Sequence, residues 1–181
     1  MNDPNTTKQL KLEVCYEKIL ETLGYHGPNF ADTPKRVARM LIRFHEPVTY
    51  NTTSFPLTQK GGMIIVKNHE CWSFCPHHLL PVKYIIKMAY VPEAKVLGLS
   101  KLAWIADDLM RFMPLQEELA SLIGQEIQKA ILPKGVGVIV TGTHLCMRMR
   151  GVESAHAEAV SSFMSGLFLT DDKCRMEFIT L

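Results

Sequence analysis

Residues 82–91, VKYIIKMAYV, form the stretch that decides the fold. Apolar side chains occupy every second position from Val82 to Tyr90, whereas Lys83 and Lys87 fall on the opposite side. Alternation with a period of two is typical of a strand that buries one face. The sequence therefore predicts a half-buried strand here, with the neighbouring segments building a sheet around it.

The segments on either side of this strand predict an α+β fold. Further strands are expected over 63–67, from 136 through Cys146 towards 149, and over 158–168; helices are expected over 10–22, from Asp32 as a capping residue, from Ser100 as a capping residue, and from Pro114 to Leu132. Short links between consecutive strands favour an antiparallel sheet with two helices on one face. We expect one domain over 1–181, with a helical N-terminal portion over 1–50 and a core over 60–181.

Composition narrows the possible functions. The chain has 181 residues, of which 47% are apolar and 21% charged, as in ordinary globular proteins. A net charge of +2 is too small to indicate a nucleic-acid partner, and no apolar run is long enough to span a membrane. Five cysteines at uneven spacing suit reduced thiols and metal binding. With a polar N-terminus that carries no targeting pattern, we expect a cytoplasmic protein.

A candidate metal site lies in residues 71–80, CWSFCPHHLL. Cys75 and His78 have the C-x2-H spacing that lets a tight turn present sulfur and nitrogen to one zinc ion. On an extended strand Cys146 would share a face with His144, and it would complete a set of three ligands if that face meets the turn. Three ligands leave a position open for water and indicate catalysis. A structural zinc would need a fourth side chain, for which Cys71 and His69 are the nearest candidates.

Other polar residues are candidates for acid-base chemistry and substrate binding. His77 and His144 lie beside the candidate ligands in the sequence, where a general acid or base would serve a metal-bound hydroxide. A single histidine is nevertheless more often a hydrogen-bonded structural residue. The Gln116-Glu117 pair offers an amide and a carboxylate to the donor edge of a purine, but the helix dipole alone also favours a glutamate there. Arg36 and Arg39 line one helix face that suits an anion or simply solvent.

Several motifs occur together in a familiar order. They are DTPKRVA at 32–38, CPHHLLP at 75–81, GLSK at 98–101, QE at 116–117 and HLCMRMRG at 144–151. Together they resemble GTP cyclohydrolase I, and the likeness covers the chain from about residue 10 to its end. Five positions depart from the usual pattern of that family. Pro76 replaces a glutamate beside the metal, Trp104 replaces an arginine that follows the Ser-Lys pair, and Phe112, Pro114 and Glu118 replace the usual residues around Gln116-Glu117.

The resemblance implies a tunnelling fold, whose members assemble into rings, usually decamers, with active sites between subunits. It also implies a role for each matching residue. Zinc would be held by Cys75, His78 and Cys146; His77 and His144 would act as acid and base; Gln116 and Glu117 would contact guanine; Ser100, Lys101, Arg150, Arg36 and Arg39 would contact the triphosphate. A cluster of cationic side chains suits a triphosphate without making the whole chain basic.

The implied reaction is the zinc-dependent hydrolytic opening of the guanine imidazole ring of GTP. Formate leaves, and the opened sugar rearranges to give 7,8-dihydroneopterin triphosphate. Two alternatives remain: a tunnelling-fold relative with another reaction, such as a deazaguanine nitrile reductase, and a zinc-stabilised ring protein that binds a nucleotide without turnover.

Overall fold

The computed structural model describes residues 4–59 and 61–181, and contacts divide the chain into two compact units. The first unit ends at Pro47, and the second runs from Val48 to Leu181. This boundary lies near the expected end of the helical N-terminal portion, while the expectation of a single domain stays a prediction. Within the described ranges, no helix combines the length and the apolar character that crossing a bilayer requires.

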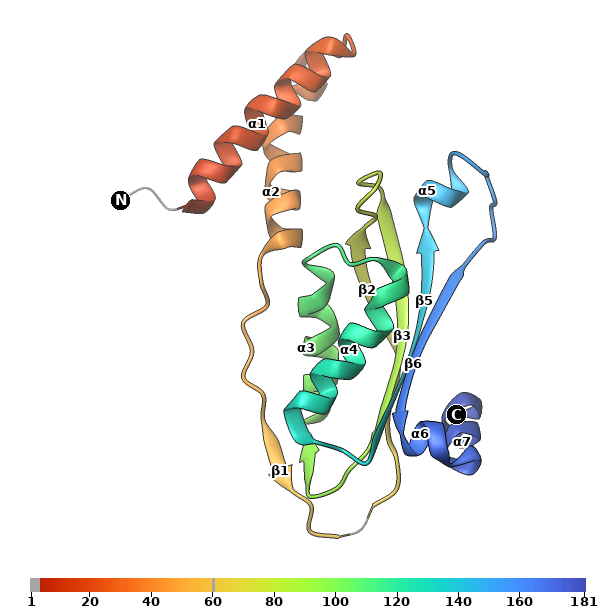
Figure 1. The fold of residues 1–181 in the computed structure, drawn as a ribbon. Coiled ribbons are helices and arrows are strands. Elements are labelled where there is room, and N and C mark those ends of the chain that lie inside the picture. The colour runs from red at the N-terminus through yellow and green to blue at the C-terminus, as the bar shows by residue number, and fades with distance from the viewer. Residues whose placement is uncertain (1–3, 60) are drawn as a thin grey trace. The chain divides into compact units, whose positions relative to one another are not determined.

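The first unit consists of two helices joined by a short 3-10 turn (Figure 1). They are α1 (Pro4–Thr22), η1 (Pro28–Phe30) and α2 (Thr33–His45). α2 begins where the sequence predicts, with Pro34 and Ala38 buried, whereas Arg36 and Arg39 are exposed. The predicted cap is wrong: the Asp32 side chain makes no hydrogen bond to the helix N-terminus and instead lies 3.4 Å from the Arg36 guanidinium.

The second unit is organised around a four-stranded antiparallel sheet. Its strands are β2 (Ile64–Phe74), β3 (Pro81–Val91), β5 (Gly135–His144) and β6 (Ala159–Gly166), in the order β2-β3-β5-β6. A separate small sheet pairs β1 (Ser54–Pro56) with β4 (Lys95–Leu97). Because β3 pairs with β2 on one side and with β5 on the other, its alternating residues lie at the centre of the sheet.

Two helices, α3 (Leu99–Met110) and α4 (Gln116–Ile131), cover one face of this sheet (Figure 1). The apolar side of β3 meets them, and the predicted stripes are buried in one core that includes Val82, Tyr84, Ile86, Met88, Tyr90, Leu102, Ile105, Leu119, Ile123 and Ile127. The expected α+β class is therefore confirmed, with the sheet and helix arrangement of a tunnelling fold.

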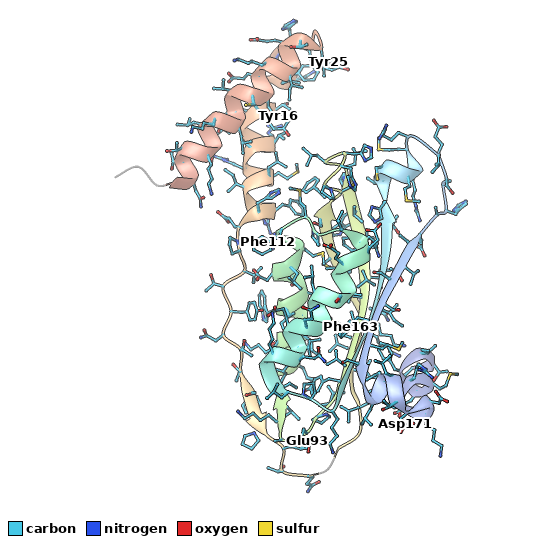
Figure 2. All side chains as sticks on the ribbon, in the orientation of Figure 1. Tyr16, Tyr25, Glu93, Phe112, Phe163 and Asp171 are labelled. Carbon is cyan, nitrogen blue, oxygen red and sulfur yellow. The ribbon has the colours of Figure 1, made fainter. Side chains whose placement is uncertain are left out.

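A close approach between α4 and β6 depends on Gly124. The ring of Phe163 points from β6 towards the helix (Figure 2). A Cβ atom at Gly124 would lie 2.1 Å from Cδ1 of that ring, far closer than real carbon contacts allow. The missing side chain of Gly124 therefore lets α4 settle on the sheet.

The opposite face of the sheet is covered in part by α6 (Leu167–Thr170) and α7 (Asp172–Thr180) (Figure 1). The sequence predicts neither helix, and the strand expected to continue to residue 168 ends at Gly166. The rings of Phe168 and Phe178 meet edge to face with centroids 5.3 Å apart, and both contact a small core at Ala89 of β3. Asp171 caps α7, because its carboxylate accepts hydrogen bonds from the backbone N–H groups of Lys173 and Cys174.

Several element boundaries differ from the predictions. β2 extends to Phe74, well beyond the short strand expected over 63–67, and its register shifts between Val66 and His69. β5 ends at His144, so the expected extension towards residue 149 is wrong. Gly98 stands at the N-cap of α3, so Ser100 lies within the first turn and does not cap it.

Candidate functional site

The turn between β2 and β3 places Cys75 beside two histidines. The Cys75 N–H donates to the Leu80 carbonyl (2.9 Å), and the Cys75 carbonyl accepts from the N–H groups of His78 (3.3 Å) and Leu79 (2.8 Å). Leu79 adopts a left-handed conformation, with φ of 51°, that lets the chain reverse. The Cys75 sulfur therefore lies 3.7 Å from Nδ1 of His78 and 3.8 Å from Nδ1 of His77.

Cys146 reaches this turn from a short helix, α5 (Leu145–Arg148), that follows β5. The pairing of Val82 with His144 brings the end of β5 to the same end of the sheet as the turn. The predicted reason for the approach, an extended strand with His144 and Cys146 on one face, is therefore wrong. The predicted meeting still occurs, because the ligand atoms of Cys75, His78 and Cys146 all lie within 4.8 Å of one another.

The electrostatics at Cys146 favour a cation. Burial raises the pKa of the Cys146 thiol, and the neighbouring Cys75 raises it further, whereas the backbone and the Arg150 guanidinium lower it. Two neighbouring thiols are difficult to deprotonate together, because the two thiolates would repel each other. A divalent ion that binds both sulfurs removes this repulsion by neutralising their charge. Two sulfurs and one imidazole nitrogen also match the donor set of many catalytic zinc sites.

Neither candidate for a fourth ligand joins this group. Among the described residues, the metal-competent cluster at the turn holds only Cys75, His78 and Cys146. His69 and Cys71 gather instead with Asp107 of α3, again with ligand atoms within 4.8 Å of one another. The expected alternative of a four-ligand structural zinc therefore gains no support from the positions of His69 and Cys71.

His144 is held by the side chain of Gln116. The Gln116 amide nitrogen is within hydrogen-bond distance of the carbonyls of Val140 (3.3 Å) and Ala159 (3.4 Å), which can only accept, so the orientation of the amide is fixed. Its oxygen must then accept from His144 Nε2, 3.1 Å away. Burial lowers the pKa of His144, although Glu117 acts in the opposite direction. A neutral His144 therefore keeps Nδ1 unprotonated and able to accept a proton.

The remaining predicted substrate residues fall into three places. Glu117 and Arg150 lie near the metal-competent cluster, since Glu117 acts electrostatically on His144 and Arg150 acts on Cys146. Ser100 and Lys101 stand in the first turn of α3, whereas the last turn of that helix adjoins the Cys75 end of β2 through a bond from Ser73 Oγ to the Met110 carbonyl (2.8 Å).

A rise of about 1.5 Å per residue puts Ser100 about 15 Å along α3 from Met110. One copy of the chain therefore does not bring Ser100 and Lys101 together with the cluster. Arg36 and Arg39 belong to the other compact unit.

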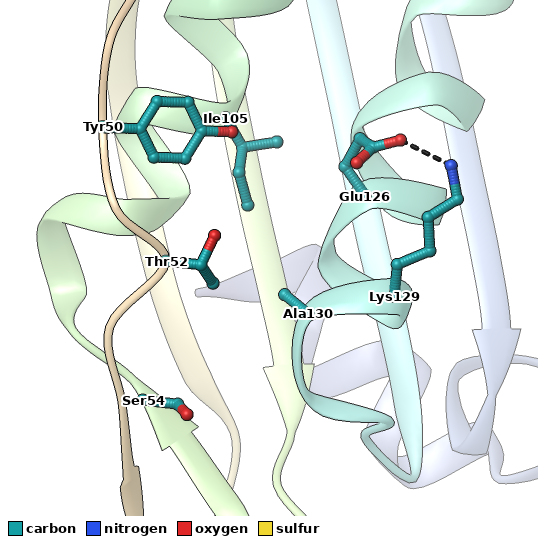
Figure 3. Close-up of a pocket in the computed structure, with 7 residues that line it drawn as sticks. All are labelled: Tyr50, Thr52, Ser54, Ile105, Glu126, Lys129 and Ala130. Carbon is teal, nitrogen blue, oxygen red and sulfur yellow. Dashed lines mark hydrogen bonds and ion pairs between the residues drawn. The ribbon is translucent and has the colours of Figure 1, made fainter.

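A separate shallow pocket of about 350 Å³ lies between the chain segment before β1 and the helices α3 and α4 (Figure 3). It contains an ion pair between Glu126 and Lys129 (2.6 Å), and burial is the main cause of a raised pKa at Tyr50. None of the predicted site residues lines this pocket. We therefore place the candidate chemistry at the β2–β3 turn.

Comparison with known proteins identifies the family. The family model described as GTP cyclohydrolase I matches residues 12–181. The chain belongs to the GTP cyclohydrolase I family. A GTP cyclohydrolase 1 from Coxiella burnetii is 41% identical over 172 residues, covering 90% of this chain and 92% of that protein. One from Leptospira biflexa is 44% identical over 178 residues, covering 94% of this chain and 97% of that protein.

A solved structure of the archaeosine synthase QueF-Like in the apo form is a more distant match. It is 21% identical, with a TM-score of 0.49 over 60% of this chain and 97% of that one. This likeness is too weak to support a conclusion, and the assignment to the GTP cyclohydrolase I family does not depend on it.

Two residues that position Gln116 of the GTP cyclohydrolase I motifs are not predicted from the sequence. Ser161 of β6 donates to the Gln116 carbonyl (2.8 Å) and so helps to seat that residue. Gly142 of β5 leaves room for Gln116, because a Cβ there would lie 2.2 Å from the Gln116 amide oxygen. Neither role can be predicted from the local sequence, because both depend on how β5 pairs with β6.

Proposed function

We propose that this protein catalyses the hydrolytic opening of the guanine imidazole ring of GTP, releasing formate and forming 7,8-dihydroneopterin triphosphate. Membership of the GTP cyclohydrolase I family supports this reaction over that of a nitrile reductase. The single observation that carries the proposal is the convergence of Cys75 and His78, from the β2–β3 turn, with Cys146 from α5. Within the described part of the chain, that cluster has three protein ligands, as catalytic zinc sites do.

Zinc is the proposed metal, and Cys75, His78 and Cys146 would hold it. When bound, zinc supplies a Lewis acid that brings the pKa of water to about 7 and so provides a nucleophile at neutral pH.

His144 and His77 would move protons next to this metal. His144 is fixed by Gln116, and its lowered pKa favours the neutral ring that can take up a proton at Nδ1. His77 belongs to the same turn as the ligands, with Nδ1 3.8 Å from the Cys75 sulfur, and we assign it the second acid-base role. One ring would accept a proton while the other gives one to the departing purine nitrogen.

Glu117 and Gln116 are the proposed guanine contacts. Glu117 stands in the first turn of α4, next to the residue that holds His144. A carboxylate there can accept hydrogen bonds from the donor edge of guanine. The Gln116 side chain already bonds to β5, β6 and His144, and its carbonyl accepts from Ser161, so its backbone N–H and the adjacent Glu117 carboxylate are the groups proposed for the base.

Cationic side chains would bind the triphosphate. Arg150 lies near the ligands, and Ser100, Lys101, Arg36 and Arg39 would complete the contacts. Because Ser100 and Lys101 lie at the far end of α3, the proposal includes a site shared between copies of the chain.

A ring-shaped homo-oligomer, which we propose to be a decamer, would provide that sharing. β2 and β6 are the edges of the four-stranded sheet, and open edges can pair with strands of another copy. The cysteines of the described chain are free thiols, which suits a reducing compartment, and we propose that the protein works in the cytoplasm without nucleic-acid or membrane partners.

The test uses the full chain, GTP and zinc, with and without a chelator. We expect formate and, after oxidation, a fluorescent pterin, both abolished by the chelator and by Cys146→Ala. Cys174→Ala is the matched control, because Cys174 is another partly buried thiol that lies outside the cluster. The proposal fails if zinc-loaded protein gives neither product while an active family member does so in parallel. Binding of GTP without product would favour the non-enzymatic alternative.

A further inference from the structure

A second group of metal-competent side chains lies where α3 crosses the edge strand β2. His69 and Cys71 are two residues apart on β2 and face the same side of the strand. Asp107 of α3 lies close to both side chains. The His69 Nε2 atom lies 2.9 Å from an Asp107 carboxylate oxygen. The three candidate ligand atoms all lie within 4.8 Å of one another.

We propose that His69, Cys71 and Asp107 form a second binding site for a divalent transition-metal ion of the zinc type, separate from the site at Cys75. This ion would tie α3 to the edge of the sheet. The site needs neither GTP nor the chemistry at the β2–β3 turn, so it stands independently of the proposed function.

The donor set fits such an ion. Imidazole nitrogen, thiolate sulfur and carboxylate oxygen are the three ligand types that zinc takes in proteins. Their usual bond lengths put neighbouring ligand atoms around a tetrahedral zinc about 3.4 to 3.6 Å apart. The span of 4.8 Å among the three atoms needs only small side-chain rotations to contract, and the 2.9 Å His69–Asp107 contact would open by about half an ångström.

The Cys71 thiol of this group is buried and lies next to the Asp107 carboxylate. Burial raises the pKa of Cys71 to about 12, and the carboxylates of Asp107 and Glu70 add to the effect. A divalent ion bound by Cys71, His69 and Asp107 would replace the thiol proton and offset the negative charge of the two anionic ligands.

An ion can reach the proposed position. The side chains of His69 and Asp107 are 18% and 31% exposed, whereas Cys71 is buried. Ligands from β2 and from the second half of α3 would be joined through one ion. Such a link restrains a helix on a sheet more strongly than the His69–Asp107 hydrogen bond alone.

The experiment measures zinc per chain by elemental analysis after saturation and removal of loosely bound metal. We expect two zinc ions per wild-type chain and one in each of His69→Gln, Asp107→Asn and Cys71→Ser. Glu70→Gln is the matched control for charge, since Glu70 is paired with Lys83 at 2.7 Å, and Cys174→Ser is the control for thiol number. Both controls should keep two.

A second measurement covers the case in which the Cys71 variant folds poorly. Cobalt added to the Cys75→Ala, Cys146→Ala double variant should still give a thiolate charge-transfer band, and adding His69→Gln to that background should remove it. One zinc per wild-type chain, unchanged in His69→Gln and Asp107→Asn, would overturn the proposal. Loss of GTP turnover would not affect this result, because the readout is bound metal.

Discussion

The Gln116 amide oxygen accepts a hydrogen bond from His144 Nε2 at 3.1 Å, which joins the first residue of α4 to the last residue of β5. This contact selects one tautomer of the proposed acid-base histidine. Gln116→Ala should therefore lower kcat for formate release by about 10- to 100-fold, the usual effect of a misplaced catalytic group, and should alter the pH profile. Gln125→Ala is the control, because that exposed amide bonds only to Ser121 in the described structure. An unchanged kcat and pH profile would show that Gln116 does not position His144.

Gly142→Ala should disturb the hydrogen bond between Gln116 and His144, because Gly142 packs against the Gln116 side chain. A Cβ at Gly142 would lie 2.2 Å from the Gln116 amide oxygen and 2.9 Å from Tyr84 Cε1. Overpacking of this kind costs about 1 to 3 kcal/mol, so urea unfolding should shift to lower concentration and activity should fall with it. Gly62→Ala, where no atom lies within 4 Å of the added carbon, should change neither quantity.

Gly124→Ala tests the approach of α4 to β6. Alanine favours a helix over glycine by about 1 kcal/mol, yet the Phe163 ring occupies the space that the new Cβ needs. We expect a net loss of about 1 to 2 kcal/mol in unfolding free energy. Phe163→Leu should recover part of that loss in the double variant, a coupling that a double-mutant cycle measures. Additive effects of the two substitutions would contradict the packing argument.

Asp171→Ala should destabilise the C-terminal helix α7. The carboxylate of Asp171 accepts from the N–H groups of Lys173 (2.9 Å) and Cys174 (3.3 Å), and loss of such a cap costs about 0.5 to 2 kcal/mol. Asp171→Asn keeps a capping oxygen and should retain most of the stability. Faster amide hydrogen exchange over Asp172–Thr180 in the alanine variant alone is the expected signature; equal exchange in both variants would count against the cap.

The sequence predicts most of the sheet and the proposed ligands, because each carries a short-range signal. The alternation from Val82 to Tyr90 is local, and so is the Cys75–His78 spacing. What it misses depends on contacts between distant segments. Local periodicity does not show that β5 stops at His144 and that a helical turn carries Cys146 to the ligands.

Pairing between distant elements explains the other omissions. Asp107 looks like an ordinary polar residue of α3 until the packing of that helix on β2 places it beside His69. Gln116 likewise reveals its bond to His144 only once β5 and β6 are paired. The prediction that Ser100 caps α3 was wrong for a more local reason, because the N-cap is Gly98, two residues before Ser100.

The length of α3 separates Lys101 from the Cys75 end of the sheet, and that separation has a genetic consequence. If the triphosphate contact and the metal ligands of one catalytic centre come from different copies, two inactive alleles can rescue each other. Co-expression of Lys101→Ala with Cys146→Ala should then restore activity, with about one centre in four intact in randomly mixed rings. A heterozygous cell would retain function that neither allele provides alone.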